Sequence, residues 1–277
     1  MTLPILSNKS PSPHSDGFTL LEILMVVALV AVVAVTSIIV ITDSLNESRF
    51  QDTLNKMHQI ANAMIGDPSL KENGARTSFG FLGDIGAIPT AAQSISVLVT
   101  NSVPLPAWAV DTTVNFGIGW NGPYLSGENS GTDYTKDAWG NAFVYSPTAS
   151  PPTLVSLGAD GVAGGTGYNQ DITVTLPSEL TTATTVSGYV TNHYSAFKTA
   201  VDVQLNYPNG SGVLVQTPYT VTTPTGFFTF SNVPYGMRSI TACIPSLAVC
   251  TTKLGPVLIT IDKPNYTVPP GSLDTNP

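Results

Sequence analysis

An uncharged apolar stretch from Ile23 to Ile41 constrains this chain more than any other feature. Its nineteen residues contain no charged side chain, and only Thr36 and Ser37 are polar. At about 1.5 Å per residue, a helix of this length spans roughly 28 Å, close to the thickness of a bilayer core. A cleaved secretory signal fits less well, because the stretch is too long and no Ala-x-Ala site follows it. The sequence therefore predicts a single membrane span at about residues 23–41.

A lone carboxylate, Glu22, stands at the start of this stretch, in the motif Gly17-Phe18-Thr19-Leu20-Leu21-Glu22. A charge at this place is costly in lipid and needs a partner, which a plain single-span anchor does not provide. The motif and the long apolar helix after it resemble the class III leader of type IV pilins and type II secretion pseudopilins. The resemblance implies that prepilin peptidase removes residues 1–17, cleaving after Gly17, and that the new N-terminus at Phe18 is methylated.

The same resemblance implies a role for these residues in assembly. The amine of mature Phe18 would pair with Glu22 of a neighbouring subunit, inside a filament core of packed apolar helices. Such pairing offsets the cost of keeping both charges out of water. Two alternatives stay open: Glu22 snorkels to the lipid headgroups, or it serves only recognition by the peptidase.

The helical pattern continues beyond the apolar stretch. Between residues 42 and 64, apolar side chains recur at helical spacing and alternate with polar ones. They are Leu45, Phe50, Leu54, Met57, Ala61 and Met64. Gly66, Asp67 and Pro68 then end the pattern. We therefore expect one helix over residues 18–66, whose second half packs on a globular head.

Residues 67–177 are punctuated by Gly and Pro and predict a small β-rich head. Short strands are expected at 143–145 and 153–155, and a short helix or strand at 91–100. The block D-A-W-G-N-A-F-V-Y (137–145) precedes the block S-L-G-A-D-G (156–161). This order resembles the C-terminal half of the major pseudopilins of type II secretion, the general secretion pathway protein G family.

In that family the loop after the A-D-G block binds calcium, which takes six to eight oxygen ligands. The family's second acidic ligand falls here on Gly167, which has no side chain, so nearby residues are the substitutes. The resemblance implies a ligand set of the Leu157 and Val162 carbonyls, Asp160, Asn169 and Asp171. The alternative is a Gly-rich turn in which Asp160 caps backbone amides.

The chain changes character again at a polar, Thr-rich joint, residues 178–185, which we expect to be a domain linker. Seven short runs beyond it predict an all-β sandwich over residues 186–277. They are Val186–Val190, Val201–Leu205, Val213–Gln216, Tyr219–Val221, Phe227–Phe230, Ser239–Cys243 and Val257–Ile261. The segments S-G-Y-V (187–190), V-D-V-Q-L (201–205) and G-F-F-T-F-S-N-V-P-Y-G (226–236) resemble the carboxypeptidase regulatory-like, transthyretin-type domain, a non-catalytic module.

The two cysteines, Cys243 and Cys250, lie close together near the C-terminus, with six residues between them. A local hairpin can bring them together, and in an exported protein a disulfide is favoured over two buried thiols. A metal site is disfavoured because no histidine or further cysteine lies near.

Charge and motif content argue against several other functions. The chain has ten basic and eighteen acidic residues, a net charge of −8, which disfavours phosphate neutralisation and hence nucleic-acid binding. The three histidines, His14, His58 and His193, fall in three different segments, and no nucleophile-elbow, P-loop or metalloprotease motif is present. We therefore expect a protein that is not an enzyme.

Together these features predict an α+β protein with a long N-terminal transmembrane and assembly helix, a small β-rich head and an all-β sandwich. The predicted function is a structural subunit of a type IV pilus-like filament, most like a major pseudopilin of type II secretion. The resemblance implies as partners other copies of the chain, prepilin peptidase, an inner-membrane assembly platform and minor pseudopilins. One alternative is a surface type IV pilin whose sandwich serves adhesion or lateral contacts, and another is a non-assembling membrane-anchored binding protein.

Overall fold

The computed structural model describes residues 17–125, 132–193, 195–196, 200–221 and 225–275, without the side chains of residues 35–41, 179 and 195–196. These residues belong to two compact units, Met1–Glu47 and Ser48–Pro277. The predicted leader, residues 1–17, lies outside the described residues except for Gly17. The fold is α+β, with an N-terminal helix and a β-rich body of several sheets.

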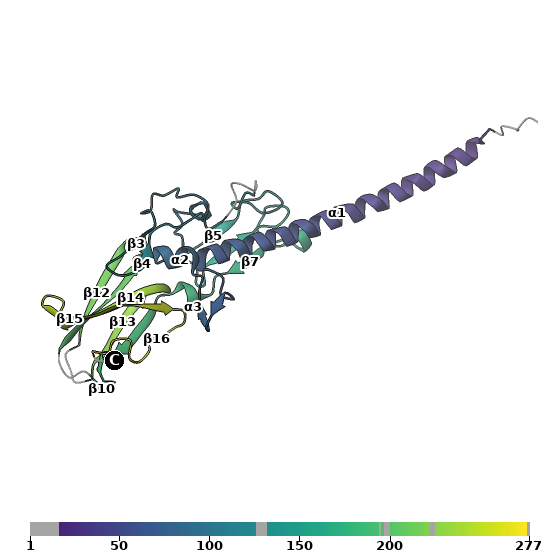
Figure 1. The fold of residues 1–277 in the computed structure, drawn as a ribbon. Coiled ribbons are helices and arrows are strands. Elements are labelled where there is room, and N and C mark those ends of the chain that lie inside the picture. The colour runs from purple at the N-terminus through teal and green to yellow at the C-terminus, as the bar shows by residue number, and fades with distance from the viewer. Residues whose placement is uncertain (1–16, 126–131, 194, 197–199, 222–224, 276–277) are drawn as a thin grey trace, which may run out of the picture. The chain divides into compact units, whose positions relative to one another are not determined.

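Helix α1 runs without interruption over Leu20–Ile65 (Figure 1). It ends because Gly66 takes a left-handed φ of +78°, which leaves the helical conformation. Glycine is required at this position, since a Cβ there would lie 2.2 Å from the carbonyl oxygen of Ser78. Among the residues described, no helix contains a segment both long and apolar enough to cross a membrane. The predicted span at 23–41, which includes side chains 35–41 that are not described, is therefore not confirmed.

From Ser48 onward, α1 belongs to the second unit and forms part of its core. Met57 and Ile60 are fully buried, as are Met64 and Ile65 to within a few per cent. The predicted apolar stripe is thus correct toward the C-terminal end of α1. Leu45, which belongs to the first unit, is instead 53% exposed.

The head segment, residues 67–177, consists of small elements joined by turns. Helix α2 is Gly80–Ile85, and the 3₁₀ helices η1 and η2 are Ile95–Leu98 and Gly167–Asn169. Its strands are β1 (Lys71–Glu72), β2 (Ala75–Arg76), β3 (Ala109–Asp111), β4 (Phe116–Ile118), β5 (Val144–Ser146), β6 (Thr153–Ser156) and β7 (Ile172–Thr175). Strands β1 and β2 pair, as do β3 and β4, while β5, β6 and β7 form an antiparallel sheet in that order. The strands predicted at 143–145 and 153–155 thus appear as β5 and β6, and the stretch 91–100 contains the helix η1.

The C-terminal part contains two larger sheets. After a short helix α3 (Ser178–Thr181), the strands are β8 (Thr184–Tyr189), β9 (Thr191–Asn192), β10 (Ser195–Ala196), β11 (Val201–Pro208), β12 (Leu214–Val221), β13 (Phe227–Val233), β14 (Gly236–Pro245), β15 (Cys250–Ile261) and β16 (Tyr266–Thr267). One sheet has the order β12-β11-β14-β15 and the other β13-β8-β16. Their buried faces join α1 and the head segment in one hydrophobic cluster.

Two details of these sheets bear on the sequence predictions. The two runs predicted at Val213–Gln216 and Tyr219–Val221 form a single strand, β12, which passes through Pro218 opposite Gln204. This prediction was wrong because β12 is an edge strand, where a proline can lack its N–H without breaking a ladder bond. Cys243 on β14 and Cys250 at the start of β15 form a disulfide, with their Cα atoms 5.1 Å apart.

The head segment and the C-terminal sheets share buried contacts within the second unit. The Arg238 side chain on β14 is fully buried and donates through Nη1 to the carbonyl of Gly83 in α2 at 2.9 Å. The backbone N–H of Gly212, in the β11–β12 turn, donates to the carbonyl of Ile85. The domain boundary expected at residues 178–185 stays a prediction. The compact units of the chain divide between Glu47 and Ser48, and the head segment and the C-terminal sheets fall in the same unit.

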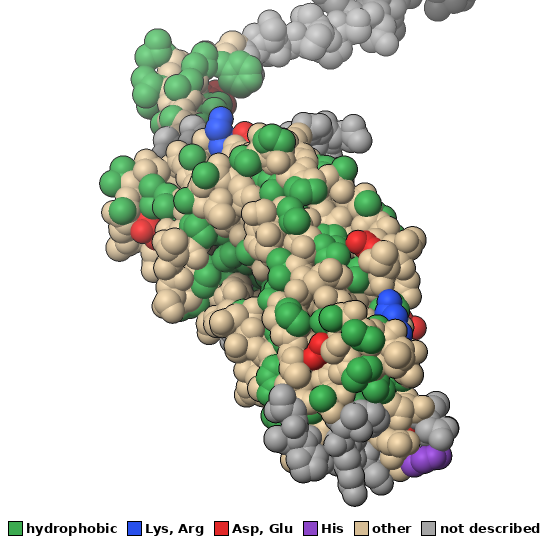
Figure 2. Space-filling model, turned by 90° about the vertical axis from the view of Figure 1, so that its left-hand side faces the viewer, with side chains coloured by type: hydrophobic (Ala, Val, Ile, Leu, Met, Phe, Trp, Pro, Cys, Tyr) green, Lys and Arg blue, Asp and Glu red, His purple; other side chains and the backbone are tan. Residues whose placement is uncertain are grey.

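The surface carries few charges. On the face in Figure 2, the few Lys, Arg, Asp and Glu side chains stand alone or as neighbours of opposite charge among apolar and uncharged polar ones. This agrees with the low charged fraction of the chain, 10%. Binding of a partner to this face would therefore depend on individual side chains rather than on the electrostatic potential of an extended patch of like charge.

Candidate functional site

The start of α1 carries the residues predicted to act in processing and assembly. Thr19 begins the helix, since its carbonyl and its hydroxyl accept the N–H of Glu22 at 3.1 and 3.3 Å. Phe18 is 78% exposed, and Glu22 is exposed as well. Both line one shallow hollow whose other walls are apolar side chains of the next turns. Phe18 and Glu22 are therefore on the same side of the helix start and are accessible to another chain.

The D-A-W-G-N block is a turn organised by one buried carboxylate. Asp137, only 3% exposed, accepts the backbone N–H groups of Trp139 and Asn141 and the hydroxyl of Ser156. The amide of Asn141 donates to the carbonyl of Gly158 at 2.7 Å. The two sequence blocks that carry the family resemblance are thus joined in space by hydrogen bonds.

The same region is tied to the buried half of α1. The Lys56 ammonium donates to the carbonyls of Asp133 and Lys136, at 3.2 and 3.1 Å. Thr53 accepts the N–H of Ala138 at 3.0 Å. The turn that precedes the D-A-W-G-N block therefore lies along α1 and reaches it through backbone groups.

The predicted calcium loop, residues 157–171, closes on itself. The N–H of Ala159 donates to the carbonyl of Tyr168, and that of Asp171 donates to the carbonyl of Gly164. Asp160 is exposed, and its Oδ1 accepts the N–H of Val162 at 3.1 Å, as the turn alternative requires. No cluster of three acidic, histidine or cysteine side chains suited to a metal occurs in the described part of the chain.

One atom of this loop nevertheless fits a cation. Asp171 Oδ1 is buried and has no hydrogen-bond partner. An unpaired buried carboxylate oxygen is costly, and a bound cation is one way to satisfy it. The backbone carbonyls of a Gly-rich loop are also ligands that calcium accepts. The residues present are therefore compatible with calcium at Asp171, while Asp160 is engaged in its own turn.

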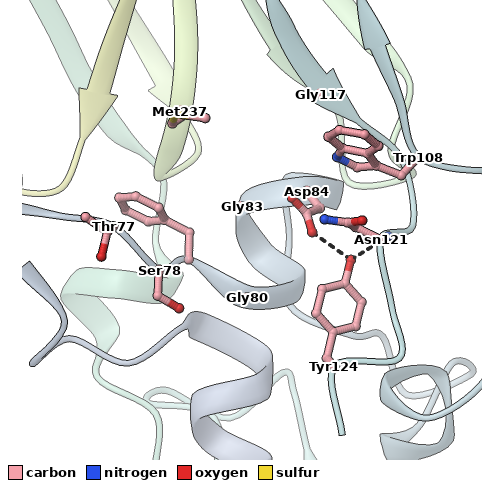
Figure 3. Close-up of a pocket in the computed structure, with 11 residues that line it drawn as sticks. Thr77, Ser78, Gly80, Gly83, Asp84, Trp108, Gly117, Asn121, Tyr124 and Met237 are labelled. Carbon is pink, nitrogen blue, oxygen red and sulfur yellow. Dashed lines mark hydrogen bonds between the residues drawn. The ribbon is translucent and has the colours of Figure 1, made fainter. Parts of the chain in front are cut away.

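A second site lies in a cavity of about 360 Å³ between α2, the segment around Trp108 and Tyr124, and β14. Figure 3 shows Asp84, Asn121, Tyr124 and Trp108 on one side of this cavity and Thr77 and Met237 on the other. The Tyr124 hydroxyl donates to Asp84 Oδ2 at 2.9 Å and accepts the N–H of Asn121 at 3.0 Å. Burial raises the pKa of Asp84 to about 6, although the Tyr124 hydrogen bond and the charge of Arg238 oppose the shift. Burial also raises the pKa of Tyr124, which stays a neutral donor at physiological pH.

Sequence reasoning missed this cavity. The motifs G-D-I-G-A-I-P (83–89) and G-W-N-G-P-Y-L (119–125) contribute residues to it, but they lie in a Gly- and Pro-rich stretch for which the sequence predicted only a small β-rich head. Side chains from the two motifs lie close together in this cavity, but the spacing of the residues in the sequence does not predict that contact. The histidines behave as expected: His58 and His193 lie on α1 and in the C-terminal part, and His14 lies outside the described residues.

Comparison with known protein families agrees with two of these regions. Residues 80–175 match the family described as type II secretion system (T2SS), protein G. Residues 13–38 match the prokaryotic N-terminal methylation motif. No curated protein and no solved structure gives a significant match.

The two matches cover the start of α1 and most of the head segment, and neither extends into β8–β16. Together they support a pseudopilin subunit processed by prepilin peptidase, which is a structural subunit and not an enzyme. The carboxypeptidase regulatory-like assignment of the C-terminal sheets is not confirmed.

Proposed function

We propose that this chain is a major-pseudopilin-like subunit of a type II secretion filament. The observation that carries the proposal is the combination of an N-methylation motif at the start of α1 with a protein G-type head packed on the end of the same helix. In this proposal, prepilin peptidase cleaves after Gly17 and mature Phe18 is methylated. Residues 23–41 hold the subunit in the inner membrane, with the head on the periplasmic side, until the assembly platform and the minor pseudopilins take it into the filament.

Assembly in this proposal depends on a pair between two subunits. The Phe18 amine of one subunit pairs with Glu22 of its neighbour, because an isolated charge among packed apolar helices costs several kcal/mol. The exposure of both residues on one side of the helix start supports this role. The pair would set the axial offset between neighbouring helices.

The test of pairing compares two carboxylates of the same helix. Glu22→Gln is expected to be processed but to assemble poorly, whereas Asp43→Asn, which removes an exposed carboxylate beyond the predicted span, is expected to assemble normally. Processing is read from the N-terminal sequence and assembly from the amount of sedimenting filament. Normal filament yield from Glu22→Gln would remove the pairing role and leave snorkelling or peptidase recognition.

A surface pilin is the second candidate, favoured by the C-terminal sheets β8–β16, which the protein G match does not cover. We infer that these sheets form the carboxypeptidase regulatory-like sandwich, available for adhesion or lateral contacts. The deciding measurement is the intact mass and N-terminal sequence of the protein in sheared filaments and in the washed envelope. Mature protein confined to the envelope favours the secretion filament, and mature protein in sheared filaments favours the surface pilus. Uncleaved protein in both fractions would refute both and leave an anchored binding protein.

Calcium is proposed to occupy the loop 157–171, with Asp171 as its main carboxylate ligand. Asn169, the carbonyls of Leu157 and Val162, and Asp160 are the further donors, and on binding Asp160 exchanges its hydrogen bond from the N–H of Val162 for the cation. The buried, unpaired Oδ1 of Asp171 supports this proposal. Bound calcium would supply charge neutralisation that holds the loop closed.

Binding to the folded state alone raises stability with ligand concentration, so calcium is expected to raise the melting temperature of the protein. Asp171→Asn and Asp160→Ala are both expected to abolish the gain. Asp133→Asn, which removes an exposed carboxylate elsewhere in the head, should keep it. Identical melting curves of the unmodified protein in calcium and in chelator would refute the proposal.

A further inference from the structure

The cavity over Asp84 holds an incompletely compensated carboxylate. Asp84 is the one charged side chain among the described residues that line it. The nearest cation, Arg238, donates to four backbone carbonyls, those of Pro234, Tyr235, Met237 and Gly83. Its charge acts on Asp84 but is weaker than the effect of burial. The carboxylate therefore retains capacity for a further donor, most favourably a charged one.

An aromatic ring stands beside this carboxylate. The Trp108 indole lies against the backbone of Gly117, where a Cβ atom would come within 2.2 Å of the ring. The absence of a side chain at Gly117 thus leaves room for the indole, and Trp108 remains 41% exposed. A cation over the face of a tryptophan is attracted by its quadrupole.

The opposite side of the cavity carries Thr77 and Met237, and Met237 is 51% exposed. Phe79 also lines the cavity but is only 7% exposed, so Met237 supplies most of the accessible apolar surface there. These groups can cover a short aliphatic stem, and the cavity of about 360 Å³ has room for one long side chain. An alkyl chain that ends in a cation satisfies all three features, whereas a neutral sugar would leave the desolvated charge of Asp84 uncompensated.

We propose that this cavity binds a basic side chain, lysine or arginine, of a partner polypeptide, with its charged end at Asp84 and its stem between Trp108 and Met237. The recognition is one of charge and shape and does not depend on filament assembly. The groups facing Asp84 are Tyr124 and Asn121 from its own side of the cavity and Arg238 from β14. Tyr124 and Asn121 are neutral donors, and the Arg238 guanidinium is occupied by backbone carbonyls, so a charged donor in the cavity still gains from Asp84.

The proposal is tested with Nα-acetyl-lysine amide as the probe and full-length protein in detergent, labelled with ¹⁵N at tryptophan. The chain has three tryptophans, so three indole signals are expected, and Trp108→Phe identifies one of them. The lysine probe should shift the Trp108 signal saturably. Asp84→Asn should weaken binding by about tenfold or more, the loss expected for at least 1.4 kcal/mol of charge pairing. Asp133→Asn, an exposed carboxylate outside the cavity, should leave binding unchanged.

Three outcomes would overturn the proposal. One is an equal shift with Nα-acetyl-norleucine amide, which has the stem but no charge. Another is unchanged affinity in Asp84→Asn at a melting temperature that shows a folded protein. The third is a shift produced by neutral oligosaccharides and not by the lysine probe. Binding should also weaken as the pH falls through about 6, because the carboxyl group is then neutralised.

Discussion

Asp84 should make the folded protein less stable at neutral pH, and its replacement by asparagine should stabilise it. Burial raises the pKa of this group from 3.8 to about 6 in the folded state. The folded state therefore binds the proton more tightly than the unfolded chain, and stability falls as the pH rises between about 4 and about 6. Below that window both states are protonated, and above it the full cost is present.

The size of the effect follows from the shift. Each unit of pKa corresponds to about 1.4 kcal/mol, so a shift of this size amounts to roughly 3 kcal/mol. Asp84 retains some exposure, and solvent screening reduces the expected value to about 2 kcal/mol. Asparagine has the same shape, and its oxygen can still accept the Tyr124 hydroxyl, but its amide nitrogen cannot accept the hydrogen bond from the Asn121 side chain. Asp84→Asn should therefore recover part of this free energy of unfolding.

The assay is chemical denaturation of the full-length protein in detergent, followed by tryptophan fluorescence at about pH 7.5 and at about pH 3, below the pKa of the carboxyl group in both states. Asp84→Asn should be more stable at the higher pH and equal to the unmodified protein at the lower pH. The control, Asp133→Asn, should show no gain, because hydrogen bonds from Thr135 lower the pKa of Asp133 and favour its charged form. A variant that is less stable at the higher pH would refute the argument that burial dominates at Asp84.

Two further predictions concern interactions that stabilise the second unit, the hydrogen bonds of Arg238 and the disulfide. Arg238→Met should lower the free energy of unfolding by about 3 to 5 kcal/mol, because it leaves the four backbone carbonyls that accept from Arg238 without their donor. A loss below about 1 kcal/mol, measured by chemical denaturation, would contradict this prediction. The double replacement of Cys243 and Cys250 by serine should cost about 2 to 3 kcal/mol, the value expected for closing a short loop. Reductant should lower the melting temperature of the unmodified protein to that of the double-serine variant, and it should leave the melting temperature of the variant unchanged.

The N-terminal region was the most predictable part of the chain. Helix α1 and its end at Gly66 follow from contiguous patterns, an apolar stretch, a 3.6-residue period and a Gly-Asp-Pro stop. The D-A-W-G-N and L-G-A-D-G blocks carried the resemblance to protein G, which the match over residues 80–175 supports, and such blocks are readable in the sequence because their residues form local turns, such as the one around Asp137. Strand β12 was mispredicted as two strands because Pro218 is acceptable only at a sheet edge, and edge position is a property of the whole sheet.

The sequence by itself determined what depends on neighbouring residues: the long helix, the processing motif, the turns and the closeness of the two cysteines. Only the tertiary structure decided which distant groups meet. Gly83 and Arg238 are 155 positions apart and yet share a hydrogen bond, and Asp84 and Tyr124 are 40 positions apart. The cavity over Asp84 exists because two sheets, the helix α2 and the Trp108 indole, which lies against Gly117, pack together. The raised pKa of Asp84 is a consequence of its burial in that packing. Local patterns carry no record of such packing, which is set by the burial of the shared core.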